Sequence, residues 1–431
     1  MVELSLAASL EESASPEQNR YLDVCQAAAA QLEMPLYLVG GAIRDLLLTG
    51  KTLDLDIDLV VEGDALALGE VVAQELGVRP RAHRRFLTAE IELGDTHIDL
   101  VTARRERYDE PASLPRVEPG ELEDDLARRD FTVNAMALRL WPPGDEQVVD
   151  PWGGREDLAK RRLRVLYDRS FFDDPTRILR GARIGARLNL EFDTRTANLA
   201  AEAIAVGAFD PLSGTRLRHE LILLLEDEQV ELSLKRLAEL GFLPVLNLPR
   251  KWTESDWTPL RSVLKLREKG LPGAADDLEP HWWLALLMSL CARDPRSERE
   301  QLARRLDLDG ELRRTLVDFA ERTERAVAVM EAPDATPHEV CVMLDALAPE
   351  ELVVVMATGS DEVIRWVDRW LTELRDLRLA IDGDDLRAVG FAESPQLGRA
   401  LEETLTARQN GSIDVSQELE FAVETMRKES E

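Results

Sequence analysis

The sequence is poor in cysteine and has no long apolar run. Only three cysteines, Cys25, Cys291 and Cys341, occur in 431 residues, and they lie far apart, without the close spacing of zinc ligands. Such a pattern favours neither a disulfide framework nor a zinc site, and it fits a reducing cytoplasm. The longest apolar run, WWLALLMSLCA from Trp282, has 11 residues, too few to span a bilayer. The first 20 residues lack the basic start and apolar core of a signal peptide. We therefore expect a cytoplasmic protein with no membrane partner.

Basic residues are also scarce. Lysine and arginine together number 53 against 83 acidic residues, which gives a net charge of -30. Taken alone, this charge argues against a nucleic-acid partner, because contacts to phosphates need cations. It is equally consistent with an adaptation to high salt or for solubility. Arginines nevertheless cluster in KRRLRVLYDR and RILRGARIGAR, and we expect the arginines of residues 161–187 to line one cleft.

The chain is long enough for two to four domains, and its character changes near Asp150. Before that point, strand-like segments such as PLYLV and DIDLVV alternate with helical ones, and FLTAEIEL and THIDLVTAR read as a hairpin turning at Gly94. From Arg155 onward helical periodicity dominates to the C-terminus. The pattern predicts an α+β segment followed by a long helical region.

The stretch DLDIDLVVEG places aspartates on alternate positions of a predicted strand. Asp56 and Asp58 therefore share one face, while Ile57 and Leu59 face apolar packing on the other. Neighbouring carboxylates repel unless a cation neutralises them, and hard divalent cations prefer oxygen ligands. Asp99, on the later strand HIDLV, is a candidate third carboxylate. This pattern predicts a site for one or two Mg2+ ions suited to phosphoryl transfer.

The alternative explanation is a solvated strand edge, and Asp54 fits that description or a turn. The preceding Gly40-Gly41 pair favours a site. Glycine allows backbone N–H groups to approach a phosphate closely, and a helix N-terminus attracts anions. Arg44, one turn into the predicted helix, would add a charge-assisted contact to the same phosphates.

Five blocks, in order, resemble class II of the tRNA nucleotidyltransferase and poly(A) polymerase family: LVGGAIRDLL, DIDLV, RRDFTVNAMAL, DPWGGREDL and FFDDPTRILRGARIGAR. The resemblance covers roughly Leu36 to Glu220. It implies an α+β head with a mixed sheet, of the polymerase-beta-like nucleotidyltransferase fold, in residues 20–150. An all-helical neck that selects the nucleotide would follow in residues 151–225, and a helical body and tail that bind tRNA in residues 226–431.

The block RRDFTVNAMAL carries nucleotide contacts in this family. The resemblance makes Gly41 part of the nucleotide site, Arg129 a phosphate-binding arginine and Asp130 an acceptor for the ribose 2′-hydroxyl. Asn134, four residues on along an expected helix, would brace the same sugar. In DPWGGREDL we expect Asp150 and Asp157 to cap and hold local structure rather than to catalyse.

The block DDPTRILRGAR is assigned to base selection by the same resemblance. On a helix, Asp174 and Arg177 would lie side by side as an acceptor beside a donor. Cytosine and adenine both present an amino donor next to a ring-nitrogen acceptor, whereas guanine and uracil reverse this pattern and would leave buried groups unpaired. Arg180 and Arg183 continue the same helix face and would hold the base or the triphosphate.

The expected activity is that of a nucleotidyltransferase that adds C, A or both to the tRNA 3′ end. It would use CTP, ATP and Mg2+, need no nucleic-acid template and release pyrophosphate. Its catalytic residues would be Asp56, Asp58 and Asp99, with Asp56 and Asp58 as metal ligands. Its macromolecular partner would be the acceptor arm and 3′ end of tRNA.

Three alternatives remain at this point. Where full CCA-adding enzymes usually carry an arginine-arginine-proline loop, this chain has DEPASLPRVEPGEL, which we expect to form a flexible loop. The change resembles enzymes that add only CC or only A, so a separate A-adding enzyme would be a possible partner. Poly(A) polymerase is a second alternative, although the C-terminal QELEFAVETMRKESE is acidic. A catalytically inactive RNA-binding homologue is the third.

Overall fold

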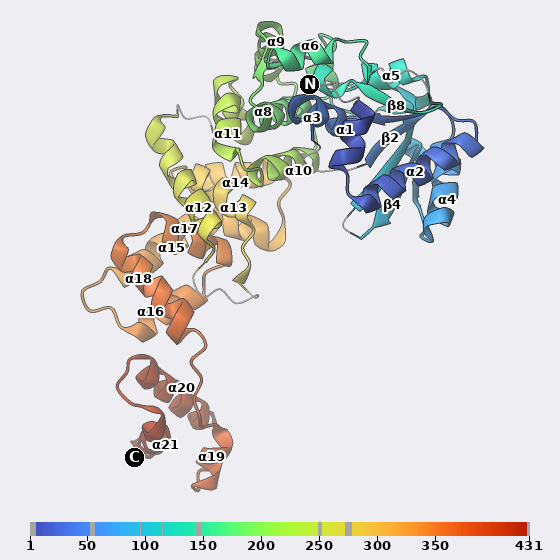
Figure 1. The fold of residues 1–431 in the computed structure, drawn as a ribbon. Coiled ribbons are helices and arrows are strands. Elements are labelled where there is room, and N and C mark those ends of the chain that lie inside the picture. The colour runs from blue at the N-terminus through green and yellow to red at the C-terminus, as the bar shows by residue number, and fades with distance from the viewer. Residues whose placement is uncertain are drawn as a thin grey trace. The chain divides into compact units, whose positions relative to one another are not determined.

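The computed structural model describes residues 6–51, 57–94, 96–113, 115–143, 148–248, 252–271 and 278–428. The chain forms two compact units, Met1–Val245 and Leu246–Glu431 (Figure 1). Asp54 and Asp56 lie outside the described residues. Among the described residues, no helix combines the length and the apolar character needed to cross a membrane. The finer division into head, neck, body and tail stays a prediction.

A seven-stranded mixed sheet forms the frame of the first unit, in the order β3-β4-β5-β2-β1-β8-β9. Its strands are β1 (Leu36–Val39), β2 (Ile57–Val61), β3 (Arg81–His83), β4 (Thr88–Leu93), β5 (Thr96–Thr102), β8 (Ala137–Trp141) and β9 (Val148–Val149). The predicted hairpin is confirmed, because β4 and β5 pair antiparallel across the turn at Gly94. In contrast, β2 and β5 run parallel, with Asp58 opposite Asp99.

The two faces of β2 have different surroundings, as the alternating pattern predicts. Ile57 and Leu59 are fully buried, and Leu59 pairs with Leu100 of β5. Helix α4 (Ala65–Leu76) covers this face so closely that a Cβ at Gly69 would lie 2.5 Å from the Cβ of Ala89. The opposite face carries Asp58 and therefore faces the site described below.

The other helices of the first unit lie before, between and after the strands. They are α1 (Leu6–Ser13), α2 (Pro16–Gln31), α3 (Gly41–Thr49), α5 (Leu122–Ala127), α6 (Gly154–Ala159), α7 (Ser170–Asp173), α8 (Thr176–Leu188), α9 (Thr194–Ala205), α10 (Gly214–Leu225) and α11 (Val230–Glu239), with the short 3-10 turns η1 (Arg84–Phe86), η2 (Thr132–Asn134) and η3 (Leu243–Leu246). Helices α2 and α4 pack against each other. Helix α3 contacts β1 and η2, which brings the double glycine next to the RRDF segment.

Two expectations about strands need correction. The proline-rich segment is not entirely loop, because β7 (Arg116–Pro119) pairs antiparallel with β6 (Arg104–Arg107) as a two-stranded ribbon. Strand signals also do not end completely at Asp150. The two-residue strands β10 (Arg162–Leu163) and β11 (Glu191–Phe192) pair in parallel, so the region expected to be all helical is mostly helical.

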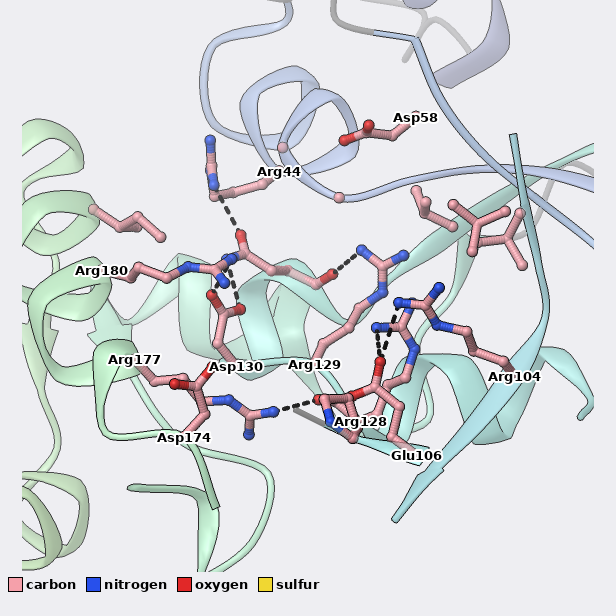
Figure 2. A pocket seen from close by; sticks show the side chains of 18 of the residues that line it. Arg44, Asp58, Arg104, Glu106, Arg128, Arg129, Asp130, Asp174, Arg177 and Arg180 are labelled. Atoms are coloured by element: carbon pink, nitrogen blue, oxygen red, sulfur yellow. Dashed lines mark hydrogen bonds and ion pairs between the residues drawn. The ribbon is translucent and has the colours of Figure 1, made fainter. Parts of the chain in front are cut away.

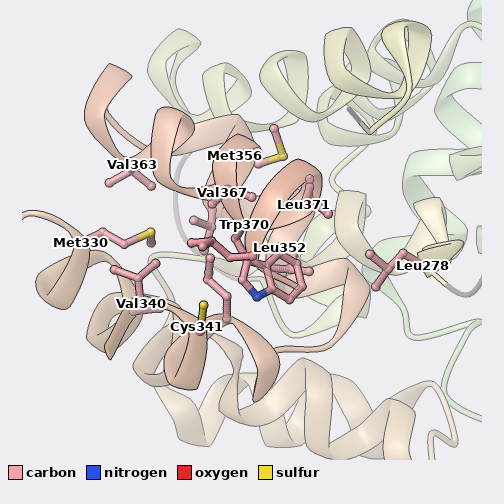
Figure 3. Packing of buried hydrophobic residues seen from close by; sticks show 14 residues of the cluster. Leu278, Met330, Val340, Cys341, Leu352, Met356, Val363, Val367, Trp370 and Leu371 are labelled. Atoms are coloured by element: carbon pink, nitrogen blue, oxygen red, sulfur yellow. The ribbon is translucent and has the colours of Figure 1, made fainter. Parts of the chain in front are cut away.

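The described part of the second unit is built from helices and helical turns. They are η4 (Glu254–Trp257), α12 (Thr258–Lys269), α13 (Trp282–Cys291), α14 (Arg296–Arg305), α15 (Gly310–Met330), α16 (Pro337–Asp345), α17 (Pro349–Thr358), α18 (Asp361–Arg369), η6 (Trp370–Leu374), α19 (Gly383–Ala388), α20 (Pro395–Gln409), η7 (Val415–Gln417) and α21 (Glu418–Lys428). One core cluster joins α15 to α18 around Leu352, Val367 and Trp370 (Figure 3). The apolar WWLALLMSLCA run supplies the buried helix α13.

Candidate active site

A polar cavity of about 580 Å³ opens between the sheet and α8 (Figure 2). Segments that are far apart in the sequence line it: the turn from β1 to α3, strand β2, the ribbon strand β6, the RRDF segment and α8. The cavity brings together ten of the residues selected from the sequence: Gly41, Arg44, Asp58, Arg129, Asp130, Asn134, Asp174, Arg177, Arg180 and Arg183. Asp99 is not among the residues that line it.

The double glycine forms a tight entry into α3. Gly40 has φ +79°, a conformation that side-chain-bearing residues rarely adopt. A Cβ at Gly40 would lie 3.3 Å from Asp58 Oδ2 and 3.5 Å from Arg129 Nη1. The backbone at Gly40 therefore passes close to a carboxylate and a guanidinium, and the N-terminus of α3 opens into the cavity.

Asp58 and Asp99 are direct neighbours across the parallel pair β2 and β5. Residues in register on adjacent strands present side chains to the same face, so two carboxylates stand next to each other there. Within the described ranges no cluster of three or more His, Cys, Asp or Glu side chains has the arrangement of a metal site. Asp56, the other predicted ligand, lies outside those ranges. Oxygen donors of this kind fit a hard divalent cation.

Asp130 and Asn134 belong to a chain of hydrogen bonds that crosses the cavity floor (Figure 2). Arg44 Nη1 donates to Asn134 Oδ1 at 2.8 Å, and Asn134 Nδ2 donates to Asp130 Oδ1 at 3.0 Å. Arg180 Nη2 lies 2.9 Å from Asp130 Oδ2. Burial acts to raise the pKa of Asp130, but Arg180 and the hydrogen bond from Asn134 outweigh it and hold the pKa below its usual value. Asp130 is therefore an ionised acceptor.

The prediction of a helix around Asp130 is wrong. Phe131 is extended, and only Thr132–Asn134 form the single 3-10 turn η2. Phe131 is fully buried and packs against Phe171 and Phe192, with ring centroids 6.5 and 6.2 Å away. The packed ring anchors the segment where the backbone turns, and the turn still allows the Asn134 amide to reach Asp130.

A buried acidic pair, which the sequence reasoning did not single out, holds the arginines of the RRDF segment. Asp125 is fully buried and accepts hydrogen bonds from Arg128 Nη2 at 2.7 Å and from Arg129 Nη2 at 3.1 Å. Glu106, on β6, accepts from Arg128 Nη1 at 2.9 Å and from Arg104 Nη2 at 3.1 Å. Burial acts to raise the pKa of Asp125, but the two guanidinium groups outweigh it and hold the pKa low. Arg128 and Arg129 follow Asp125 by three and four residues, and this spacing alone predicts the contacts.

Asp174 and Arg177 both line the cavity but do not lie on one helix. Asp174 is extended, with φ −141° and ψ 96°, and α8 begins only after Pro175. The expected helical pairing is therefore wrong, since a residue before proline avoids the α conformation. Asp174 Oδ1 instead accepts from Thr176 Oγ1 at 2.6 Å and from Arg216 Nη2 at 3.1 Å.

Arg177 is almost fully buried beside this carboxylate. Its Nη1 donates to Ser170 Oγ at 2.6 Å and to Tyr167 Oη at 3.3 Å, and its Nη2 donates to the Arg128 carbonyl at 2.7 Å. A guanidinium has five N–H groups, so these three bonds leave two for a ligand. The carbonyl contact also ties the start of α8 to the RRDF segment.

Among the arginines of residues 161–187, those that line the cavity all belong to α8. Arg183 and Arg187 line the cavity together with Arg177 and Arg180. The earlier arginines make other contacts: Arg164 Nε donates to Asp157 Oδ2 at 2.9 Å, for example. The predicted strip is therefore present over 177–187 only.

Asp150 and Asp157 support the site without lining it. Asp150 accepts from the backbone N–H groups of Gly154 at 2.7 Å and Arg155 at 2.9 Å, and so caps α6. Asp157 is fully buried and accepts from Thr132 Oγ1 at 2.7 Å. The expected structural role of both aspartates agrees with these contacts.

Comparisons with known proteins all point to one family. Residues 36–164 match the family model described as the poly A polymerase head domain. An A-adding tRNA nucleotidyltransferase of Halalkalibacterium halodurans is 34% identical over 413 residues, which cover 92% of this chain and 90% of the relative. A CC-adding tRNA nucleotidyltransferase of Deinococcus radiodurans is 32% identical over 408 residues, covering 92% and 91%. An A-adding enzyme of Geobacter sulfurreducens is 34% identical over 389 residues, which cover 88% of this chain but only 44% of that longer relative.

Comparisons with solved structures point to the same family of enzymes. An apo CCA-adding enzyme matches 98% of this chain and 99% of its own with a TM-score of 0.82 and 28% identity. A Thermotoga maritima CCA-adding enzyme, solved in complex with tRNA, matches 98% of this chain and 99% of its own with a TM-score of 0.76 and 27% identity. The α+β head with its mixed sheet and the mostly helical remainder are therefore shared with these enzymes.

Proposed function

We propose a nucleotide-adding reaction from the premise that this chain belongs to the tRNA nucleotidyltransferase family. The chain transfers a nucleotide from ATP or CTP to the 3′ end of tRNA, and addition of the terminal A is the reaction we favour. Two of the three relatives described above are A-adding enzymes, and the third is CC-adding. The observation that carries the proposal is the cavity in which Asp58, Asp130 and Asp174 face a row of arginines.

The triphosphate has a natural place at the N-terminus of α3. Backbone N–H groups at Gly41 and the side chains of Arg44 and Arg129 surround this point, and such groups bind anions strongly. Arg183 and Arg187 extend the positive lining along α8. An arrangement of this kind stabilises the charge that builds up on a departing pyrophosphate.

Asp56 and Asp58, with Asp99 as a third carboxylate, would hold Mg2+. A bound divalent ion would lower the pKa of the RNA 3′-hydroxyl and neutralise charge on the phosphates. The 3′ oxygen then forms a bond to the α-phosphorus, the bond to the bridging oxygen of the β-phosphate breaks, and pyrophosphate leaves. The proton of the hydroxyl passes to solvent. The side chains contribute mainly by positioning the reacting atoms.

The ribose lies over Asp130 in this proposal. Arg180 lies 2.9 Å from Asp130 Oδ2 as an ion pair, but this buried oxygen accepts no hydrogen bond from the described residues, so it can accept from the 2′-hydroxyl. Asn134 keeps the carboxylate in place through its 3.0 Å hydrogen bond to Oδ1. A deoxyribonucleotide lacks the donor and leaves a buried charge unpaired.

Base selection falls to Asp174 and Arg177. Asp174 supplies an acceptor for the amino group of adenine or cytosine, and Arg177 supplies a donor for the adjacent ring nitrogen. Guanine and uracil present the reverse pattern at these positions and are rejected. The remaining helices, including the second unit, grip the tRNA by shape and backbone contacts. The reaction takes place in the cytoplasm.

The two forms of partial addition, A alone and CC alone, make different products. We test them by incubating the chain with Mg2+, ATP and CTP and with tRNAs that lack the 3′ end, end in C or end in CC, and then sequencing the 3′ ends. Extension only of the tRNA ending in CC, by one A, supports A addition. Extension to CC alone makes the chain a CC-adding enzyme whose product needs a separate A-adding enzyme. Absence of extension on all three tRNAs contradicts the proposal.

A further inference from the structure

Asp45, on the second turn of α3, is buried next to the cavity but is not among the residues that line it. Its Oδ1 accepts a hydrogen bond from Arg44 Nε at 2.8 Å and lies 2.8 Å from Arg44 Nη2. Because adjacent residues of a helix do not face each other, the Arg44 side chain curls back over α3 to make this contact. A Cβ at Gly41 would lie 3.3 Å from Arg44 Nη2, so the glycine leaves room for the curled guanidinium. Asp45 thus holds two of the three guanidinium nitrogens from outside the cavity.

The third nitrogen of this guanidinium connects Arg44 to the sugar side of the site. Arg44 Nη1 donates to Asn134 Oδ1 at 2.8 Å, and Asn134 Nδ2 donates to Asp130 Oδ1 at 3.0 Å. Arg44 and Asp130 stand on either side of the amide (Figure 2). A guanidinium only donates and an ionised carboxylate only accepts, so the amide has a single orientation that satisfies both neighbours.

This amide decides which oxygen of Asp130 remains for a ligand. The Asn134 amide and the Phe131 backbone N–H, at 2.8 Å, both donate to Oδ1. Asp130 is almost fully buried, and its Oδ2 accepts no hydrogen bond from the described residues. If Arg44 no longer fixes the amide, the amide can turn its oxygen toward the carboxylate, which repels it. Asp130 then loses the contact that keeps Oδ2 in place.

Arg44 depends on Asp45 because the guanidinium is itself buried, with 4% of its surface exposed. Burial lowers the pKa of Arg44, and the charge of Asp45 is the largest effect that opposes it. A buried charge without its partner is strongly unfavourable. Removal of the Asp45 carboxylate therefore favours side-chain conformations in which Arg44 leaves Asn134.

We propose that Asp45 is a positioning residue that sets the preference for ribonucleotides over deoxyribonucleotides. The inference rests on the proposed function, because it assumes that Asp130 accepts from the 2′-hydroxyl. Asp45 holds Arg44, and Arg44 orients the Asn134 amide. The amide in turn keeps the Asp130 carboxylate in the position that binds the sugar.

The test compares the dissociation constants of ATP, dATP and 3′-dATP, with Mg2+ and without RNA. The dATP-to-ATP ratio of these constants reports the contact to the 2′-hydroxyl. The 3′-dATP-to-ATP ratio reports the loss of a hydroxyl that Asp130 does not bind in this proposal. A change in the phosphate contacts of Arg44 affects all three nucleotides alike and cancels in both ratios. A purely structural role of Asp45 leaves both ratios unchanged.

Two substitutions of Asp45 differ in how much of the contact they remove. Asp45→Ala lowers the dATP-to-ATP ratio about tenfold, the change expected for loss of a charge-assisted hydrogen bond. Asp45→Asn keeps an acceptor oxygen but not the charge, and lowers the ratio about fivefold. Both variants keep the 3′-dATP-to-ATP ratio of the wild type.

Asp256→Asn is the matched control. Asp256 lies in the second unit, is 7% exposed, and accepts from Arg293 Nη1 at 3.1 Å. The substitution therefore removes the charge of another buried aspartate that is paired with an arginine, away from the chain of hydrogen bonds through Asn134. It changes neither ratio.

A double substitution tests whether Asp45 acts through Asn134. Asn134→Ala removes the amide between Arg44 and Asp130, and by itself lowers the dATP-to-ATP ratio. Addition of Asp45→Asn to Asn134→Ala leaves the ratio where Asn134→Ala alone puts it, because both changes break the same connection. Additive effects would show that Asp45 acts by another route and would overturn the inference.

The outcomes separate this inference from the proposed function. A dATP-to-ATP ratio within twofold of wild type in Asp45→Asn, folded by thermal unfolding, overturns the inference, and this variant decides if Asp45→Ala does not fold. A wild type that binds ATP and dATP equally, or an equal shift of both ratios in Asp45→Asn, overturns it too. Failure of the wild type to extend any tRNA, with the dATP-to-ATP ratio still shifted by Asp45→Asn, overturns the proposed function and leaves this inference supported.

Discussion

Replacing Gly40 by alanine tests whether the turn between β1 and α3 positions Asp58, the proposed catalytic carboxylate. Gly40 has φ +79° and ψ −138°, so a side chain costs about 1–3 kcal/mol of stability from backbone strain. The new Cβ would lie 3.3 Å from Asp58 Oδ2, which has to shift by a few tenths of an ångström, and 3.5 Å from Arg129 Nη1, which is an ordinary contact. Because a small displacement of a reacting group lowers the reaction rate strongly, we expect kcat/KM for nucleotide addition to fall about tenfold.

Gly50, at the other end of α3, is the matched control. It has φ +71°, and a Cβ there meets nothing within 4 Å. Gly50→Ala therefore costs about 1–2 kcal/mol through strain alone and leaves the active site unchanged. Urea unfolding measures the stability of both variants, and single-turnover addition to tRNA measures activity. Equal activity of Gly40→Ala and Gly50→Ala at matched folded fractions would refute the reasoning.

Further predictions concern the carboxylates of the site. Asp130→Asn lowers the preference for ATP over dATP about tenfold in competition assays, because the ionised acceptor for the 2′-hydroxyl is lost; an unchanged preference argues against the ribose role. Asp99→Asn raises the Mg2+ concentration for half-maximal activity about tenfold if this side chain supports the metal, and an unchanged Mg2+ titration removes it from the metal site. Asp125→Ala costs about 3 kcal/mol in urea unfolding, because Arg128 and Arg129 lose their shared partner; a cost under about 0.5 kcal/mol contradicts this. The pKa of Asp125 is held below its ordinary value of 3.8, so its stabilising contribution is complete above that pH and is lost as the pH falls through the lower folded-state value. Asp125→Asn therefore flattens the fall of stability as the pH drops below 3.8, and a slope equal to that of wild type contradicts the assignment.

Local patterns in the sequence predicted the framework of the site well. The alternation of apolar and polar residues predicted the hairpin at Gly94, and it placed Ile57 and Leu59 on the buried face of β2. The adjacency of Asp58 and Asp99 is harder to predict from the sequence. Parallel pairing of β2 and β5 joins segments that are separated by a helix and two further strands. Periodicity alone does not specify which strands become neighbours.

The errors have local physical causes. Asp174 was expected on a helix with Arg177, although Pro175 disfavours a helical conformation at the preceding residue. The buried ring of Phe131 between Phe171 and Phe192 replaced an expected helix by one 3-10 turn. Both sequence signals, the proline and the aromatic residues, are present in the sequence.

Arg216 could not be selected from the sequence. Its two acceptors, the Ala112 carbonyl and Asp174 Oδ1, lie in separate segments, and no spacing rule connects them. Every residue has a backbone carbonyl, so the type of residue does not show which carbonyl will accept a hydrogen bond. Contacts of this kind become visible only when the tertiary structure brings Ala112 to α10.

The most direct test of the nucleotide site is a crystal structure of the chain with Mg2+ and a non-hydrolysable ATP analogue. We expect the triphosphate at the N-terminus of α3 beside Gly41 and Arg44, the ribose 2′-hydroxyl on Asp130, and the adenine amino group on Asp174 Oδ2. An analogue that binds outside this cavity, or that lies in it with the base away from Asp174, would contradict the central assignment.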